Sequence, residues 1–452
     1  MFNKILIANR GEIAVRIIRA CKEMGISTVA VYSEVDKNAL HTQLADEKVC
    51  IGGNRSASSY LNMNNIISAA CLTGANAIHP GFGFLSENAK FADMCRECKI
   101  KFIGPDAETI HLMGNKSNAR KLMIKAKVPV IPGSDGLVKD LEEVKDFAKE
   151  YKYPIIIKAS AGGGGRGIRI VREESELEEA YNSAKTEAKN AFGDDSLYVE
   201  KVIENARHIE IQVLADEHGN AIHLGERDCS LQRRNQKVLE EAPSVALDKK
   251  TREEMGEASL RAVKVSNYKN AGTIEFLYDK SNKFYFMEMN TRIQVEHPVT
   301  EMVTDIDIVK EQIRIAYGNK LKYKQEQVNF VGHSIECRIN AEDPKNNFIP
   351  CAGKIDYLFL PSGGKGLRVD SGVYAGYVIP SFYDSMIAKV ITRGKTRAEA
   401  IAKMKRALDE FVVDGISTNV EFQMEILENE KYIKGDFDTS FVQREILDKI
   451  NK

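Results

Sequence analysis

The side chains best suited to chemistry lie in a run of alternating polar residues at 284–297, FYFMEMNTRIQVEH. Side chains alternate between the two faces of a strand, so one face is expected to carry Glu288, Asn290, Arg292, Gln294 and Glu296. A solvated strand face is often polar as well. However, solvation alone does not require an arginine and a glutamine between acids, and this mixture favours a functional site.

A second strand-like run, TIEFLY at 273–278, precedes this segment and predicts a β-hairpin. A turn centred between Ser281 and Asn282 would place Glu275 directly opposite Glu288, with Cβ atoms about 5 Å apart. Like charges at that distance are destabilising, so a cation is expected between them. Mg²⁺ suits this place, because it takes one or two carboxylates and completes its coordination with water and substrate phosphates.

The composition is that of a globular protein with about three domains: 452 residues, 43% hydrophobic and 29% charged. The net charge is −1, and no basic block favours nucleic acid or a membrane surface as a partner. No run approaches the roughly 20 apolar residues of a membrane span, and the N-terminus does not resemble a signal peptide, so a cytoplasmic location is expected. The eight cysteines are dispersed and do not predict a disulfide framework.

The first part of the chain predicts a parallel sheet. A strand at 4–9, a helix at 12–24 and a strand at 26–33 form a βαβ unit, which is Rossmann-like but lacks the full dinucleotide fingerprint. A single helix is expected over 106–127. The stretch PVIPGSDG at 129–136 is then expected to be a linker into a separate small subdomain.

A glycine run, AGGGGRG, lies between predicted strands at 153–160 and 168–172. Residues 162–167 match G-x-G-x-x-G, but a strand and not a helix follows, which argues against a Rossmann site. Glycines between two antiparallel strands favour a flap whose N–H groups close over phosphates, with Lys158 as a point charge beside them. The alternative is a mobile hairpin tip without a ligand.

A charged segment at 221–243 allows two interpretations. It contains Arg227, Arg233, Arg234 and Lys237 among several acids. It is either an ordinary charged surface turn or part of the same site. The region from 331 onwards predicts short strands followed by two closing helices.

Six segments together resemble biotin carboxylase, an ATP-grasp enzyme: IANRGEIAVRIIRA, HPGFGFLSEN, KASAGGGGRG, ERDCSLQRRNQK, EMNTRIQVEHPVTE and ECRINAED. The resemblance covers essentially the whole chain and implies a mixed α/β and α+β architecture. Its expected parts are a Rossmann-like N-terminal domain at 1–114, an ATP-grasp domain at 115–330 with a mobile glycine-rich lid subdomain at about 131–203, and a mixed α+β C-terminal domain at 331–452.

The resemblance implies a role for each matching residue. The residues expected to bind ATP are Lys116, Lys158, Gly164, Gly165, Glu200, Lys201, Val202, Ile203, His208, Gln232, Glu275, Leu277 and Glu288. The expected metal ligands are Glu275, Glu288 and Asn290, and the expected bicarbonate site is Lys237, Arg292, Gln294 and the Val295 backbone. Biotin is expected beside Phe82 and Arg338. The implied catalytic residues are Arg292, Glu296, Lys237 and Arg338, with Glu296 as the base and Arg338 stabilising the biotin enolate.

The implied reaction is ATP-dependent carboxylation of biotin by bicarbonate through carboxyphosphate. It would use Mg²⁺ or Mn²⁺, with biotin attached to a biotin carboxyl carrier protein, because no Ala-Met-Lys-Met sequence is present. The length resembles the separate subunit of acetyl-CoA carboxylase, which implies carboxyltransferase partners and a role in fatty acid biosynthesis. A homodimer is also expected, with Arg19 and Glu23 placed to pair across a two-fold axis.

Two departures from the family pattern and three alternatives stay open. Asn235 stands where many relatives have His, and Phe82 stands where others have Tyr. The alternatives are another bicarbonate-activating ATP-grasp ligase, such as half of a carbamoyl-phosphate synthetase, the biotin carboxylase subunit of a different acyl-CoA or pyruvate carboxylase, and a catalytically silent nucleotide-binding regulator.

Overall fold

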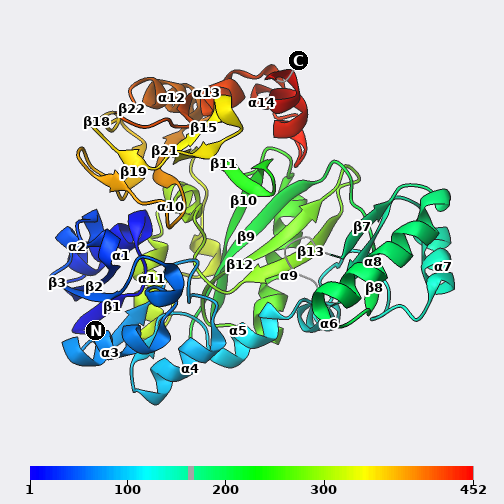
Figure 1. Cartoon of the computed structure of the whole chain (residues 1–452), viewed down its shortest axis with the longest axis horizontal. Coiled ribbons are helices and arrows are strands. Elements are labelled where there is room, and N and C mark those ends of the chain that lie inside the picture. The colour runs from blue at the N-terminus through cyan, green and yellow to red at the C-terminus, as the bar shows by residue number, and fades with distance from the viewer. Residues whose placement is uncertain (161–166, 451–452) are drawn as a thin grey trace. The chain divides into compact units, whose positions relative to one another are not determined.

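A computed structural model describes residues 1–160 and 167–450 of the chain and is shown in Figure 1. The chain forms two compact units. The first contains Met1–Val128, Arg207–Phe276 and Glu288–Lys452, and the second contains Pro129–Ala206 and Leu277–Met287. None of the helices in the described ranges combines the length and apolar character that a membrane crossing needs.

The N-terminal part of the first unit is a five-stranded parallel sheet, as the βαβ pattern predicts. The sheet order is β3-β2-β1-β4-β5, with β1 at Lys4–Ile7, β2 at Ser27–Ser33, β3 at Glu47–Gly52, β4 at Ala77–His79 and β5 at Lys101–Phe102. The associated helices are α1 (Gly11–Glu23), α2 (Leu40–Leu44), α3 (Met63–Thr73) and α4 (Ala89–Glu97). One face of α1 carries buried aliphatic residues such as Ile13, Ile17 and Ile18, which join the core around β1.

The prediction of a single helix over 106–127 is wrong. The segment forms α5 (Ala107–Gly114) and α6 (Lys116–Lys125) instead. Asn115 between them has an extended backbone, and its side chain accepts a hydrogen bond from the N–H of Asn118 at 3.0 Å. An asparagine in this role is a favourable N-cap, and it makes Lys116 the first residue of a new helix.

An eight-stranded sheet has most of its residues in the first unit, in the order β13-β12-β9-β10-β11-β14-β21-β19. Its strands are β9 (Arg207–Ala215), β10 (Ala221–Arg233), β11 (Gln236–Ala242), β12 (Asn270–Tyr278), β13 (Phe284–Asn290), β14 (His333–Asn340), β19 (Leu367–Ser371) and β21 (Met386–Gly394). Pairing of β11 with β14 carries the sheet across residue 330, the expected domain boundary. The helices in these parts of the chain are α9 (Lys249–Val265), α10 (His297–Thr304), α11 (Ile308–Ala316), α12 (Arg397–Asp409), α13 (Val420–Glu428) and α14 (Glu430–Ile433).

The charged segment 221–243 is therefore not a surface turn. It supplies two neighbouring strands of this sheet, and Arg227 is fully buried. Only the connection at Arg234 and Asn235 turns, with both residues at positive φ.

The second unit has a three-stranded sheet in the order β7-β6-β8. These strands are β6 (Ile155–Ala159), β7 (Ile168–Val171) and β8 (Leu197–Lys201), and the helices are α7 (Leu141–Tyr151) and α8 (Leu177–Phe192). Strands β6 and β7 are antiparallel, as expected for the strands that flank the glycine run. Gly164 and Gly165 themselves lie outside the described residues.

Two expectations for the β12–β13 hairpin need correction. The turn is centred on Ser281, because the N–H of Asp279 donates to the carbonyl of Lys283 at 2.9 Å. Strand β13 ends at Asn290 rather than at 297, and a turn leads into α10. Pro298 lies in the first turn of α10, where its missing N–H costs nothing, and this favours a helix start over a continuing strand.

Candidate active site

Lys237 on β11 is surrounded by three carboxylates. Its Nζ lies 2.7 Å from Glu210, 3.2 Å from Glu275 and 2.6 Å from Glu296. Burial alone would lower the pKa of Lys237, but the combined negative charge around it raises that pKa well above its usual value. The lysine therefore stays charged and joins carboxylates from β9, β12 and the start of α10.

Glu210 was not predicted from the sequence to be part of the site. It lies on β9 directly opposite Arg227 on β10, and the two side chains form a fully buried ion pair with an Nε–Oε1 distance of 2.5 Å. Arg227 also donates to Gln212 at 2.8 Å. One signal was available: His208, Glu210 and Gln212 alternate with apolar residues along one strand and so share a face.

Glu275 on β12 accepts hydrogen bonds from Asn290 at 2.8 Å and Gln294 at 3.0 Å, and it lies 3.0 Å from His208. Burial would raise the pKa of Glu275, but Lys237 and His208 hold it below its usual range. The polar face of β13 does meet Glu275 through Asn290, although the turn centre differs from the expected one. The structure therefore brings together two of the three expected metal ligands.

Glu288, the third expected ligand, lies two residues before Asn290 and on the same side of the strand. Its carboxylate is 3.3 Å from Lys116, whose side chain is largely exposed, and the Glu288 side chain is partly exposed. An exposed ion pair is weak, so both groups are available to a bound ion or phosphate. The carboxylate and amide oxygens of Glu275, Glu288 and Asn290 are hard donors that fit Mg²⁺.

A further cluster suited to a cation consists of His208, Glu210 and Glu275, whose donor atoms lie within 4.8 Å of one another. His208 is buried and also lies 2.8 Å from Gln232 through Nδ1. Two residues expected near ATP, His208 and Gln232, are thus in contact. Lys237 already neutralises part of this cluster. The cluster is therefore less available to a metal ion than the carboxylate of Glu288.

Glu296 is fully buried at the N-cap position of α10. Lys237 contacts one carboxylate oxygen at 2.6 Å, and Arg338 contacts the other at 3.0 Å. Burial would raise the pKa of Glu296, but Lys237, Arg338 and Arg227 hold it well below its usual range. Glu296 is ionised at neutral pH, and one of its contacts has to give way before it can accept a proton.

Arg338 lies on β14 and also binds Glu240 on β11, with an Nε–Oε1 distance of 2.6 Å. Glu240 is a second residue that the sequence did not reveal. Burial raises the pKa of Glu240 to about 7, although Arg338 opposes this shift. Arg338 is therefore in direct contact with Glu240, a carboxyl group whose pKa lies near neutral pH.

Arg292 and Gln294 lie in the turn between β13 and α10. Arg292 donates to Gln294 at 2.8 Å and to Asn290 at 3.1 Å, and it also pairs with Glu87 at 2.9 Å. The turn keeps these residues together even though it is not a strand. The carbonyl of Val295 accepts a hydrogen bond from Lys389 at 2.7 Å.

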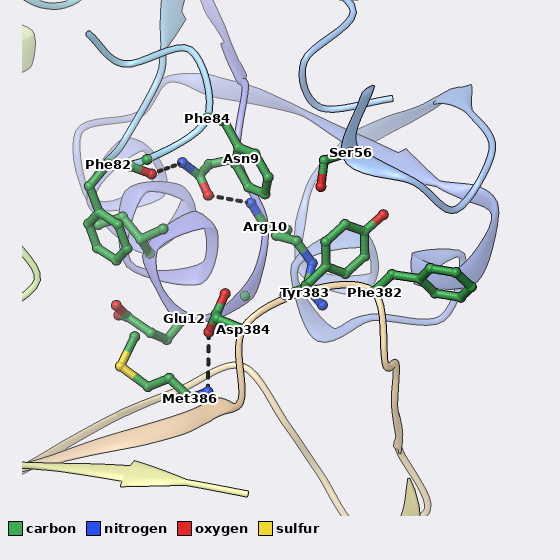
Figure 2. A pocket seen from close by; sticks show the side chains of 13 residues that line it. Asn9, Arg10, Glu12, Ser56, Phe82, Phe84, Phe382, Tyr383, Asp384 and Met386 are labelled. Atoms are coloured by element: carbon green, nitrogen blue, oxygen red, sulfur yellow. Dashed lines mark hydrogen bonds between the residues drawn. The ribbon is translucent and has the colours of Figure 1, made fainter. Parts of the chain in front are cut away.

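Phe82 lies at a cavity of about 380 Å³, which Figure 2 shows beside the start of α1. The side chain of Asn9 donates to the carbonyl of Phe82 at 2.7 Å. Arg10 stacks on the ring of Tyr383, with its guanidinium carbon 4.2 Å from the ring centre. Arg338 is not among the residues that line the cavity, so the two residues expected near biotin are not joined by this cavity.

The second unit holds the other residues expected to bind ATP. Lys158 on β6 lies 2.5 Å from Glu200 on β8. Lys201 donates to the carbonyls of Lys152 and Tyr153, and the N–H of Val202 donates to that of Pro154. Ile203 follows β8, and Leu277 belongs to the β12 segment of this unit.

The fold and these residues define an ATP-grasp protein, and the comparisons identify its family. Residues 1–110 match the family "Biotin carboxylase, N-terminal domain", 115–324 match "Carbamoyl-phosphate synthase L chain, ATP binding domain", and 336–444 match "Biotin carboxylase C-terminal domain". The chain belongs to the biotin carboxylase family and is a ligase.

Relatives and solved structures resemble the chain over nearly its whole length. "Biotin carboxylase 1" of Bacillus subtilis is 60% identical, covering 98% of each chain. A pyruvate carboxylase subunit of Methanothermobacter thermautotrophicus is 54% identical, covering 98% of this chain and 90% of that protein. A solved structure of the biotin carboxylase domain dimer of Hydrogenobacter thermophilus 2-oxoglutarate carboxylase, with MgADP, ADP and bicarbonate, has a TM-score of 0.90 and 52% identity, covering 98% and 97%.

Proposed function

We propose that this protein carboxylates biotin on a carrier protein, using ATP, Mg²⁺ and bicarbonate, as the first half-reaction of acetyl-CoA carboxylase. The observation that carries the proposal is the placement of Glu296 between Lys237 and Arg338. This arrangement supplies a carboxylate base, a cation for an anionic substrate and a second cation for a developing enolate. The relative from Bacillus subtilis named a biotin carboxylase supports it.

The bicarbonate step follows from the charges around Lys237. Bicarbonate would bind to Lys237, Arg292 and Gln294. It would replace a contact that Lys237 makes with the surrounding carboxylates and the contact between Arg292 and Gln294. As Lys237 turns to the new anion, an oxygen of Glu296 loses its partner and can take the bicarbonate proton. The deprotonated anion then attacks the γ-phosphorus of ATP and forms carboxyphosphate and ADP.

Glu275, Glu288 and Asn290 would hold the magnesium ion, which neutralises charge on the phosphates during transfer. Carboxyphosphate would then decompose to CO₂ and phosphate, and the phosphate would accept the N1 proton of biotin. Arg338 stabilises the enolate oxygen of biotin in this step. Its contact with Glu296 keeps it beside the carboxylate that started the reaction.

An assay of ADP release tests the reaction. ATP cleavage should require bicarbonate and Mg²⁺ and should increase when free biotin is added. A ligase of the carbamoyl-phosphate type would cleave ATP with bicarbonate at a rate that biotin leaves unchanged. A silent nucleotide-binding protein would show no bicarbonate-dependent turnover at all.

The final carboxyl acceptor is a separate question. The names of relatives include parts of pyruvate and 2-oxoglutarate carboxylases, which favours a keto acid as the second candidate. The carboxylated carrier, combined with matched carboxyltransferases, should pass its carboxyl group to acetyl-CoA. Efficient turnover only with a pyruvate- or 2-oxoglutarate-specific partner would reject the assignment to acetyl-CoA carboxylase.

The chain itself should give no signal on a streptavidin blot, and covalent biotin on it would contradict the carrier proposal.

A further inference from the structure

A buried lysine outside the expected site contacts the turn that carries Glu296. Lys389 on β21 is 0% exposed, and its Nζ donates to the carbonyl of Val295 at 2.7 Å. The same Nζ lies 3.1 Å from Glu12 of α1. A buried ammonium group is costly unless its charge is balanced and its donors are used. The contact with Val295 is therefore one of the few interactions that justify a lysine here.

Acids on neighbouring elements balance the charge of Lys389. Asp370 lies directly opposite it on β19, Glu12 reaches it from α1, and Glu336 is on the adjacent strand β14. These acids raise the pKa of Lys389, although burial opposes the shift. Lys389 is thus held as a cation, and its hydrogen bond to Val295 is charge-assisted.

The sheet places Lys389 next to a residue of the expected site. Lys389 and Arg338 are directly opposite each other on β21 and β14, so both project from the same face. Arg338 contacts the Glu296 side chain, while Lys389 contacts the carbonyl just before Glu296 in the chain. The Val295 carbonyl and the Glu296 N–H share one planar peptide group. Fixing that carbonyl therefore fixes the plane from which Glu296 projects.

We propose that Lys389 is a positioning residue for bicarbonate. It holds the turn of Gln294, Val295 and Glu296 so that the backbone of Val295 and the carboxylate of Glu296 face the substrate. The inference rests on the proposed function, which assigns bicarbonate to this turn. Lys389 acts through the turn and does not touch bicarbonate itself.

The test is Lys389→Met, which removes the charge and the donor but keeps the side-chain length. Losing a hydrogen bond from a charged group corresponds to about 10–100-fold, so kcat/KM for bicarbonate should fall by about that factor. The KM for ATP should change by no more than about twofold, because Lys389 contacts none of the expected ATP-binding residues that the structure describes.

Two further variants keep the test informative if Lys389→Met folds poorly. Lys389→Met combined with Glu12→Gln also neutralises the acid in direct contact with Lys389, and it should recover part of the thermal stability without recovering bicarbonate use. Lys389→Arg retains a charged donor and should keep most of the bicarbonate affinity. Arg397→Met is the matched control, because Arg397 pairs with buried Glu241 at 2.7 Å and touches no residue of the turn. It should lower stability without a selective effect on bicarbonate.

The wild-type enzyme provides the reference for both claims. If it lacks biotin-stimulated, bicarbonate-dependent ATP cleavage, the proposed function fails before the variants are considered. If it has that activity and Lys389→Met leaves kcat/KM for bicarbonate unchanged, the positioning role is wrong. Parallel losses for ATP and bicarbonate, in Lys389→Met and in Arg397→Met alike, would also overturn it, since they would reflect general destabilisation.

Discussion

Glu296 illustrates how single residues in this site combine opposite requirements. As the proposed base, Glu296 has to be ionised before the reaction, and the cations Lys237 and Arg338 ensure this in a fully buried position. The same cations make the carboxylate a poor proton acceptor, because its pKa is held low. In the proposed reaction, bicarbonate would resolve the conflict by competing with Glu296 for Lys237. Substrate binding itself would thus raise the basicity of Glu296.

The roles of Glu296 and Glu288 should differ in kind. Glu296→Ala should lower bicarbonate-dependent turnover by about 10²–10⁴-fold, the usual range for a general base, with MgATP binding nearly intact. Glu288→Gln should impair phosphoryl transfer and shift the Mg²⁺ dependence, because it removes the negative charge of a proposed metal ligand. Rates measured across a Mg²⁺ titration separate the two. Normal bicarbonate-dependent turnover of Glu296→Ala would mean that Glu296 only supports its cationic neighbours.

Glu240 should make stability depend on pH. Burial raises the pKa of Glu240 from its ordinary 4.5 to about 7, so the folded protein binds this proton more tightly than the unfolded chain. The resulting stabilisation is complete below about pH 4.5 and is lost as the pH rises through about 7. The neutral variant Glu240→Gln does not titrate at this position and therefore cannot lose this pH-dependent stabilisation. Between pH 5 and 8, the wild-type protein should therefore lose up to about 3 kcal/mol more stability than the variant.

Thermal unfolding midpoints of both proteins over this pH range provide the measurement. Glu336, directly opposite Glu240, is also buried, and the charge of Glu240 helps to raise the pKa of Glu336, so the difference between the two proteins reports this pair of carboxyl groups. Parallel pH profiles would show that Glu240 does not titrate in this range.

Sequence reasoning found the residues of the site that lie close together along the chain. The polar run from Glu288 to Glu296 could be recognised because its spacing is regular. Glu210, Glu240 and Lys389 were missed, because each lies in a strand whose local pattern gives it no distinct role. Their importance depends on pairing between strands that are distant in sequence, and only His208 and Gln212 hinted at Glu210.

Secondary-structure elements followed the periodicity where one pattern dominated. The βαβ unit that contains β1, α1 and β2 agrees with its prediction within a few residues. The errors arose where a local capping residue outweighed the pattern. Asn115 divides the expected helix over 106–127, and the chain after Asn290 turns because α10 starts with Pro298 in its first turn.

A bulge in β10 should be sensitive to substitution. The pairing of β10 with β9 shifts between His223 and Glu226, and Gly225 at this bulge has φ +74°. A Cβ there would lie 1.7 Å from the ring of Phe330. Gly225→Ala should therefore destabilise the protein by about 1–3 kcal/mol through backbone strain and displacement of the ring.

Gly219→Ala is the control for that variant. Gly219 also has positive φ, at +88°, but a Cβ added to it would meet no atom of the described residues within 4 Å. The midpoint of thermal unfolding should fall clearly further for Gly225→Ala. Equal midpoints would show that Phe330 moves aside without cost.

At the scale of the whole molecule, periodicity could not predict how the strands assemble. The eight-stranded sheet joins strands from residue 207 to residue 394, and no local pattern specifies that β11 pairs with β14. Resemblance to a known family supplied a division into domains but did not predict that this sheet continues across residue 330. The full-length relatives confirm the family. The acids and cations that build the site meet only because this sheet brings their strands together.

The whole-molecule prediction is a homodimer, and the structure changes its expected contacts. A solved relative is described as a dimer, which supports the same state here. Glu23, expected to pair with Arg19 of a second copy, instead lies 2.5 Å from Lys310 of its own chain.

Light scattering at micromolar concentration should give twice the 50.5 kDa of one chain. Arg19→Glu should raise the monomer fraction if Arg19 contributes to the interface, whereas Glu23→Gln should not, because Glu23 already has an internal partner. A monomeric mass for the wild-type protein would reject the dimer, and dissociation by Glu23→Gln alone would show that the pair with Lys310 gives way on association.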